Sequence, residues 1–240
     1  MTTHPHYPDF NYDVAEKVLA SVVALPDEHD QETWFDIRDW DNIPEQQVTT
    51  GTTEWSDNCL DDVKEVPFEE RTITANGMLE GTCGTTACLA GWAALYGGWS
   101  VITRRTEYRP GWFDTDLCVI SPDGKKEQDW TYSVDFELQG AEALGIPEDE
   151  ASTLFMMMRR EDAILHLYSV IKGGTLYEFD LWEFAQKEGV APEGSLEDYA
   201  KALDISYGEA LDLVEANLMA NIESAYRSKF DAEVAPFVKA

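Results

Sequence analysis

Two groups of side chains in this sequence could do chemistry: four cysteines, and a short run of arginines near the middle of the chain. Cys83 precedes an apolar segment that we predict to be helical, and the amides at a helix start stabilise a thiolate. A catalytic cysteine also needs a base. Of the four histidines, His4 and His6 lie in an N-terminal stretch that we expect to be loose, which leaves His29 and His166. Cys83 is thus a candidate nucleophile; alternatively, the cysteines are small buried hydrophobic residues.

The cysteines could also ligate a metal, because four thiolates can complete a structural zinc site. Such sites draw their ligands from close pairs, and here the only close pair is Cys83 and Cys88, while Cys59 and Cys118 stand alone. Cys88 falls inside the predicted helix, where its side chain would face the hydrophobic core that the helix packs against. We therefore predict no bound metal and no cofactor.

Arg104, Arg105 and Arg109 are the main local concentration of positive charge, with Arg159 and Arg160 further along the chain. Guanidinium groups bind phosphates and carboxylates through paired, charge-assisted hydrogen bonds. The first three arginines are therefore candidate ligand-binding residues for a small anion such as a nucleotide. The alternative is that each arginine pairs with one of the many carboxylates of the chain.

The formal net charge of −30 comes from 47 acidic and 17 basic residues among 240. Residues 1–80 carry −15, residues 81–130 carry −1, and residues 131–240 carry −14. Binding to nucleic acid phosphates depends on lysine and arginine, so we expect no direct nucleic acid binding. The charge is compatible with a surface that meets a basic partner protein, including by mimicry of nucleic acid. The alternative is that the acidity serves solubility or a salty habitat.

Residues 195–217 have the spacing of a helix-turn-helix, but the second helix would offer Glu209, Asp212 and Glu215 to DNA. DNA readers present arginine, lysine, asparagine or glutamine at these positions, so we interpret the pair as a helical hairpin. The sequence also contains no glycine-rich phosphate loop and no Gly-x-Ser-x-Gly elbow. Common enzyme classes are therefore not indicated.

A stretch of 23 residues from Gly81 to Thr103 contains no charged side chain. Within it we predict a buried helix that begins at Thr85 or Thr86 and ends near Tyr96, because apolar residues lie on all its sides. Alternating apolar residues predict strands over 99–104, 117–119 and 130–136, with a turn over 121–124. A small antiparallel sheet follows from these strands.

Several helices are indicated by apolar spacing and end signals. We predict a helix from Asn11 to Leu25, a helix start at Pro147, a helix that closes at Gly173, and a last helix from Tyr207 to Phe230. The fold class is α+β, mainly helical, with a small antiparallel sheet and a C-terminal helical region. We divide the chain into an α+β core over 1–173, with an acidic loop insertion at 36–80 that holds at most short elements, and a helical region over 174–240.

No cationic segment followed by an apolar run opens the chain, and Gly97 and Gly98 interrupt the uncharged block. We therefore expect neither a secretory signal nor a membrane span. Four cysteines among 240 residues are also compatible with a reducing compartment. A cytoplasmic location is the expectation.

Three segments together carry a resemblance. They are Pro-Asp-Glu-His-Asp-Gln-Glu-Thr-Trp at 26–34, Cys-Gly-Thr-Thr-Ala-Cys-Leu-Ala-Gly-Trp-Ala at 83–93, and Ala-Leu-Gly-Ile-Pro at 143–147 followed by Leu-Phe at 154–155. In this order they resemble a group of uncharacterised proteins common in bacteriophages of actinobacteria and in some bacterial genomes. The resemblance covers about residues 10–35, 80–100 and 140–173 and does not extend past Gly174. It implies a phage or bacterial origin, with the host cytoplasm as the location, and no particular chemistry.

The leading hypothesis is a non-enzymatic, strongly acidic accessory protein of phage type that binds a host or phage protein with a basic surface. A cysteine-dependent enzyme centred on Cys83 and a binder of a small anionic ligand at the arginines are the alternatives. No oligomeric state is predicted.

Overall fold

The structure is a computed structural model that describes residues 3–26, 29, 35–37, 40–43, 48–55, 64–79, 85–127, 130–131, 136–157 and 159–234. Its helices are α1 (Tyr12–Ala24), α2 (Ala75–Leu79), α3 (Leu89–Tyr96), α4 (Glu137–Leu144), α5 (Glu148–Phe155), α6 (Arg160–Ile171), α7 (Leu181–Lys187), α8 (Leu196–Leu203) and α9 (Tyr207–Lys229), with a 3-10 turn η2 (Trp40–Asn42) and a π-helical turn η4 (Phe230–Val234). Its strands are β1 (Phe35–Ile37), β2 (Val48–Trp55), β3 (Lys64–Ile73), β4 (Thr85–Ala87), β5 (Ser100–Arg109) and β6 (Trp112–Ile120). The predicted α+β class is confirmed.

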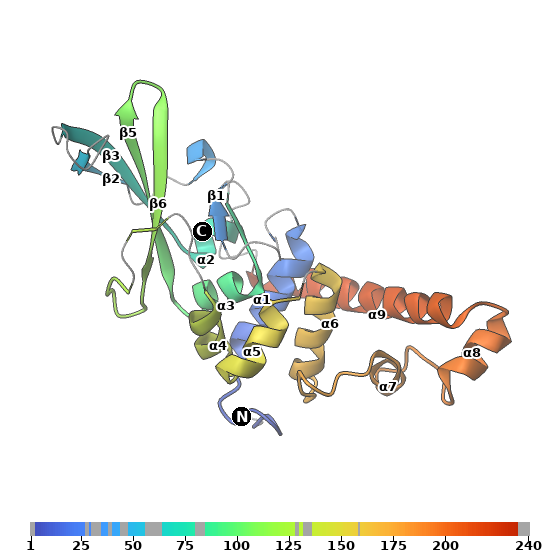
Figure 1. Ribbon diagram of the computed structural model, residues 1–240. Helices are drawn as coiled ribbons and strands as arrows, with labels where there is room; N and C mark the ends of the chain where they lie inside the picture. The colour runs from blue at the N-terminus through green and yellow to red at the C-terminus, as the bar shows by residue number, and fades with distance from the viewer. Residues whose placement is uncertain are drawn as a thin grey trace.

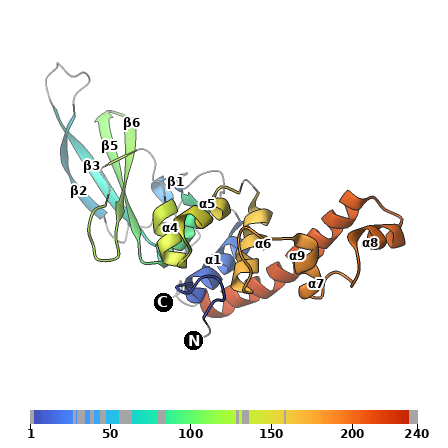
Figure 2. The ribbon, with the colours of Figure 1, turned by 60° about the horizontal axis from the view of Figure 1, so that its bottom comes forward.

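The elements are arranged along one long direction, as Figure 1 shows. An antiparallel sheet of order β2-β3-β5-β6 lies at one end, a bundle of helices around α1 and α3 lies in the middle, and α7, α8 and the start of α9 lie at the other end. A second, two-stranded sheet pairs β1 with β4. Figure 2 shows the same separation of the sheet from the far helices in a turned view.

Residues 87–95 of the uncharged block form the centre of the core. Every residue of α3 from Leu89 to Leu95 is buried, and Trp92 is among the largest fully buried side chains. Its small residues allow a close approach of α4, because a Cβ added to Gly140 would lie 2.8 Å from the carbonyl oxygen of Ala90. The predicted helix start at Thr85 or Thr86 is wrong: these residues belong to β4, which pairs with β1, and the helix begins at Leu89 with Cys88 as its N-cap.

The segment 36–80, predicted to be an acidic loop insertion, contains two long strands instead. β2 and β3 supply eight and ten residues and make up half of the main sheet. β5 and β6 confirm the strands predicted at 99–104 and 117–119. Of the strand predicted at 130–136, residues 132–135 lie outside the described residues, Thr131 makes an isolated bridge to Leu117, and Phe136 is the N-cap of α4.

The helices predicted from end signals are confirmed. Asn11 caps α1 through a bond from the amide of Val14, and α9 begins with a capping box formed by Ser206 and Glu209. The acids after Pro147 form the first turn of α5, where negative charge stabilises the helix dipole.

We call residues 181–213, which cover α7, α8 and the first turns of α9, the acidic arm. Two small apolar clusters hold it together, one around Ala185 and Val214 and one around Leu196 and Ala210. The second half of α9 packs into the main core instead, through Leu218, Ile222 and Tyr226 among others. α9 therefore carries the acidic arm on a helix that is anchored in the centre of the molecule (Figures 1 and 2). No helix among the described residues is long and apolar enough to cross a membrane.

Candidate functional site

The cysteines that the structure describes are buried. Cys88 is 1% exposed at the start of α3, and Cys118 is fully buried in β6, which confirms the alternative interpretation for these two. Cys59 and Cys83 lie outside the described residues, so the thiol chemistry predicted for Cys83 stays a prediction. In the part of the chain that is described, no group of three histidine, cysteine, aspartate or glutamate residues could hold a metal ion.

His4 and His166 have structural surroundings. His4 is 3% exposed, and its Nδ1 accepts the amides of His6 and Tyr7 at 3.2 and 3.0 Å while Nε2 donates to the carbonyl of Val170 at 2.7 Å. Burial lowers the pKa of His4. The expected loose N-terminus is therefore wrong from His4 onward, because this ring fastens the segment to α6. Burial also lowers the pKa of His166, whose Nδ1 lies 2.8 Å from the carbonyl of Asp162.

Arg104 and Arg105 do not meet in one pocket, because consecutive residues of β5 point to opposite faces of the sheet. Arg104 donates from Nε and Nη2 to one oxygen of Glu70, at 2.8 and 2.5 Å, and its guanidinium lies 4.5 Å from the centre of the Phe68 ring and 3.9 Å from that of Trp130. On the other side of Arg104 in the ladder is Asp116. Burial and the neighbouring Asp114 raise the pKa of Asp116, against the opposing effect of Arg104.

Arg105 lies on the other face, where it contacts Asp41 at 3.4 Å and stacks on Phe113 with its guanidinium 3.7 Å from the ring centre. Arg109 is exposed at the end of the β5–β6 hairpin, opposite Trp112. The structure thus pairs Arg104 and Arg105 separately with carboxylates and aromatic rings, as the alternative interpretation expects, and does not gather the three arginines around one ligand.

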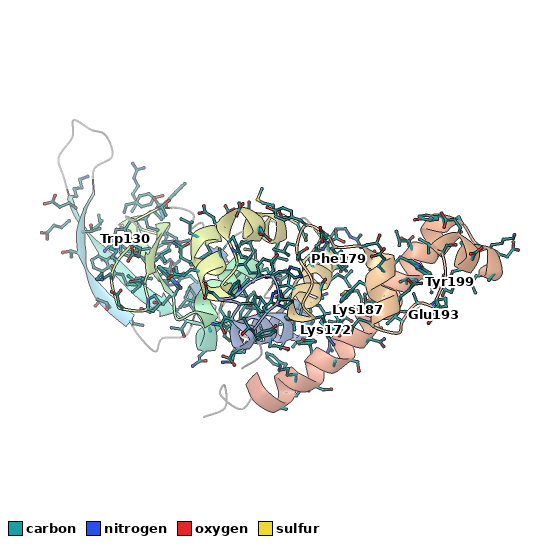
Figure 3. All side chains as sticks on the ribbon, turned by 90° about the horizontal axis from the view of Figure 1, so that it is seen from below. Trp130, Lys172, Phe179, Lys187, Glu193 and Tyr199 are labelled. Carbon is teal, nitrogen blue, oxygen red and sulfur yellow. The ribbon has the colours of Figure 1, made fainter. Side chains whose placement is uncertain are left out.

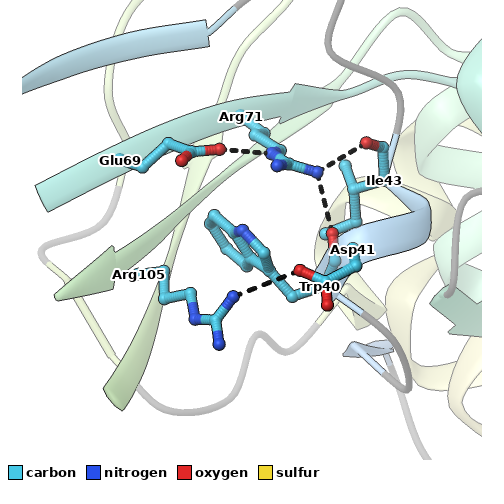
Figure 4. A network of polar contacts seen from close by, with 6 residues as sticks. All are labelled: Trp40, Asp41, Ile43, Glu69, Arg71 and Arg105. Atoms are coloured by element: carbon cyan, nitrogen blue, oxygen red, sulfur yellow. Dashed lines mark hydrogen bonds and ion pairs between the residues drawn. The ribbon is translucent and has the colours of Figure 1, made fainter. Parts of the chain in front are cut away.

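A further arginine, Arg71, was not among the candidates from the sequence. It is buried on the same face as Arg105, donates from Nε to Glu69 at 2.7 Å, and donates from Nη1 to the carbonyls of Trp40 and Ile43 at 2.8 and 2.7 Å (Figure 4). Its guanidinium also lies 5.1 Å from the centre of the Trp40 ring. These contacts attach η2 to the sheet.

Beside these residues is a groove of about 590 Å³ that crosses the sheet from β2 to β6. Its polar lining residues include Thr50 and Thr52 of β2, Glu69 of β3, and Arg105 and Glu107 of β5, and Phe113 lies at its β6 end. None of these residues except Arg105 was a candidate from the sequence. The sequence around Thr50 and Thr52 offers no signal for this face, because their neighbours are two further threonines and Gly51, so polar and apolar residues do not alternate.

The acidic arm is the second notable surface. Its exposed acids are Glu183, Glu193, Glu197, Asp198, Asp204, Glu209 and Asp212, against two exposed lysines, Lys187 and Lys201. Among the described residues, none of these seven acids forms an ion pair. Glu193, Lys187 and Tyr199 lie at the end of the molecule opposite to Trp130 (Figure 3). The arm therefore presents uncompensated negative charge far from the sheet.

Exposed apolar side chains lie among these acids. Leu203 is 45% exposed at the end of α8, and Tyr207 and Leu213 of α9 are 54% and 39% exposed. Where the arm meets the core, the charges are paired: Arg159 contacts Glu215 at 2.6 Å, and Arg160 contacts Glu223 at 3.5 Å. The structure confirms the helical hairpin predicted for 195–217 and leaves its outer face to acids and a few apolar residues.

Comparison with known proteins gives no further guide to a site. No protein-family model matches this chain, and no curated protein and no solved structure matches it significantly. A functional assignment therefore depends on the geometry and electrostatics of the chain itself.

Proposed function

We propose that this chain is a non-enzymatic accessory protein of phage type, which binds a host or phage protein with a basic surface through its acidic arm. The observation that supports this most is the set of exposed acids on the arm, with exposed apolar side chains among them. Among the described residues these seven acids have no ion pair, and the exposed cations of the arm are Lys187 and Lys201.

Uncompensated surface charge steers a partner of opposite sign and selects against partners of the same sign. Affinity requires apolar anchors as well, because a few buried side chains carry most of the binding energy of an interface. Leu203, Tyr207 and Leu213 lie among the acids and supply such anchors. Exposed acids with apolar anchors among them would suit a partner whose basic surface otherwise binds nucleic acid phosphates. We propose that the two proteins bind in the host cytoplasm.

The two alternative functions have less support. A phosphate that approached Arg104 or Arg105 would have to displace Glu70 or Asp41, which already contact these guanidiniums. For an enzyme centred on Cys83, no described residue supplies an argument.

The experiment compares two variants of equal charge. In the arm variant, Glu193→Lys, Glu197→Lys and Asp212→Lys change a loop residue, a residue in the first turn of a helix, and a residue within a helix. The control variant makes the same three kinds of change on the rest of the molecule: Glu127→Lys, Glu148→Lys and Glu142→Lys, all at exposed positions.

Each tagged protein is used to retain partners from a bacterial lysate over a salt series, and the retained proteins are identified by mass spectrometry. We expect the original chain and the control variant to retain the same basic protein at low salt. The arm variant should bind it about tenfold or more weakly, since three reversed charges at an interface rim each cost a fraction of a kcal/mol to about 1 kcal/mol. An equal loss of binding in both variants would indicate that net charge alone attracts the partner, and it would refute a role for the arm.

A further inference from the structure

The outer edge of β2 is unusually bare. β2 is the end strand of the four-stranded sheet, and among the described residues no strand pairs with its other side. Natural edge strands are normally protected by lysine, proline, bulges or very short length. β2 is eight residues long, contains neither lysine nor proline, has an unbroken register with β3, and carries one charge, Glu54, in a chain where 27% of residues are charged.

The opposite edge of the same sheet is protected. Residues that follow β6 in sequence pair with its second half: the amide of Glu127 donates to the carbonyl of Val119, and Leu117 and Thr131 exchange bonds of 2.7 and 3.0 Å. The first half of β6 carries Asp114 and Asp116. In the part of the chain that is described, one edge of this sheet is therefore covered or charged, whereas β2 at the other edge has no such protection.

The groove across the sheet begins at this bare edge. Thr50 and Thr52 of β2 form its near end, and Glu69 and Glu107 lie further in. The guanidinium of Arg105 contacts Asp41 and Phe113, and Glu69 accepts a bond from Arg71. Glu107 accepts only the backbone amide of Gly111, at 3.0 Å, and has no cationic side chain within ion-pair distance among the described residues.

We propose that the edge of β2 is a strand-addition site for an extended peptide segment that carries a basic side chain. The backbone of the segment would pair with β2, as in other cases of β-augmentation. Strands in a sheet lie about 4.8 Å apart, so Glu69 on β3 is about 10 Å from the added strand. Every second side chain of the added strand would point to the groove face. An arginine or lysine at such a position can extend past Thr50 and Thr52 toward Glu69 and Glu107. This inference concerns a different surface from the acidic arm and does not depend on it.

The probe is an acetylated and amidated nine-residue peptide of alternating threonine and valine with one central arginine, and its counterpart has glutamate in the centre. Binding is measured by titration, and the location by hydrogen exchange of the β2 amides. We expect the arginine peptide to slow exchange over Val48–Trp55, and the glutamate peptide to bind about tenfold more weakly.

Two variants test the groove and one is the matched control. Thr50→Lys fills the groove with a competing cation, and Glu107→Gln removes the charge but keeps the acceptor for Gly111; each should weaken binding of the arginine peptide about fivefold. Thr49→Lys places the same charge on the other face of the same strand and should leave binding unchanged.

Three results would overturn the proposal. One is a peptide that fails to bind or binds without slowing exchange in β2. Another is a loss in Thr49→Lys equal to that in Thr50→Lys. The third is exchange in β2 that slows with protein concentration in the absence of peptide, together with dimers in sedimentation, because the occupant of the edge would then be a second copy of the chain.

Discussion

Replacing Arg71 with methionine should be among the most damaging changes at the sheet. The Arg71 side chain is 8% exposed, and its guanidinium is the donor to two backbone carbonyls, those of Trp40 and Ile43. Methionine is an unbranched side chain like arginine but donates no hydrogen bond, so both carbonyls would stay buried without a donor from residue 71. Each such loss costs about 1–3 kcal/mol. The lost bond to Glu69 adds little, because that carboxylate is 36% exposed and remains hydrated.

We therefore expect Arg71→Met to lower the free energy of unfolding by about 3–4 kcal/mol. For a protein of this size, such a loss lowers the melting temperature by about 6–16 °C. Arg105→Met is the matched control, since the Arg105 side chain is 26% exposed and its partner Asp41 is 86% exposed. A surface pair of this kind contributes between about 0 and 1 kcal/mol.

Denaturant unfolding of both variants measures the difference, and hydrogen exchange around residues 40–43 reports whether η2 has come away from the sheet. An Arg71→Met variant that lies within about 1 kcal/mol of Arg105→Met would refute the reasoning. It would mean that the two carbonyls find other donors, or that η2 contributes little to the folded state.

Two further predictions concern the attachment of the N-terminal segment. Gly145 has a φ of +67°, and a Cβ there would lie 2.0 Å from the carbonyl oxygen of Asp9. Gly145→Ala should therefore lower the free energy of unfolding by more than about 3 kcal/mol. Gly111→Ala, at φ +77° with open space around it, should lower the free energy of unfolding by about 1 kcal/mol. Equal losses in the two variants would contradict the close contact between Gly145 and Asp9. The folded-state pKa of His4 lies below 6.5, so the unfolded chain takes up the proton first as pH falls, and stability is lost below about pH 6.5. His4→Gln should lose less stability than the original chain between pH 7.5 and 5.5, and an equal loss would show that His4 is not involved.

The helices α1, α5 and α9 could be predicted because their signals are local. Asn11 caps α1, Pro147 precedes the first turn of α5, and Ser206 and Glu209 form a capping box, all within a few residues of the helix starts that they define. The buried residues 87–95 could be recognised for a related reason: they lie in a long uncharged stretch, which in a chain of net charge −30 is readily explained as interior.

The strands β2 and β3 could not be predicted because their pairing depends on distant residues. Thr49, Thr50 and Thr52 are all exposed or half-buried, so neither face of β2 has the apolar side chains that produce a period of two. In β3, a buried position is occupied by Arg71, whose charge is offset by carbonyls that lie some thirty residues earlier. From the sequence pattern alone, that arginine is interpreted as a surface residue.

The arginine site shows what a local pattern can already decide. If the strand predicted at 99–104 is continued by one residue, Arg104 and Arg105 face opposite sides of it, so the two cannot line one pocket. What the pattern could not supply is the partner of each: Glu70 comes from β3, and Asp41 from η2. Both partners belong to the segment that had been interpreted as a loop.

The acidity of the arm has a consequence for its folding. Exposed acids without ion pairs also lie elsewhere in the described chain, at Glu142 and Glu148 for example, so the arm differs from these surfaces in how its acids are supported. In this fold Arg71, Arg104, Arg159 and Arg160 contact carboxylates at the sheet and at the base of α9, and the acids without ion pairs that we describe on the arm lie on helices held by two small apolar clusters. Mutual repulsion of these acids opposes folding of the arm, where little apolar burial is available to offset it. If the proposed partner with a basic surface binds the arm, it would reduce that repulsion, and binding would then stabilise the folded arm.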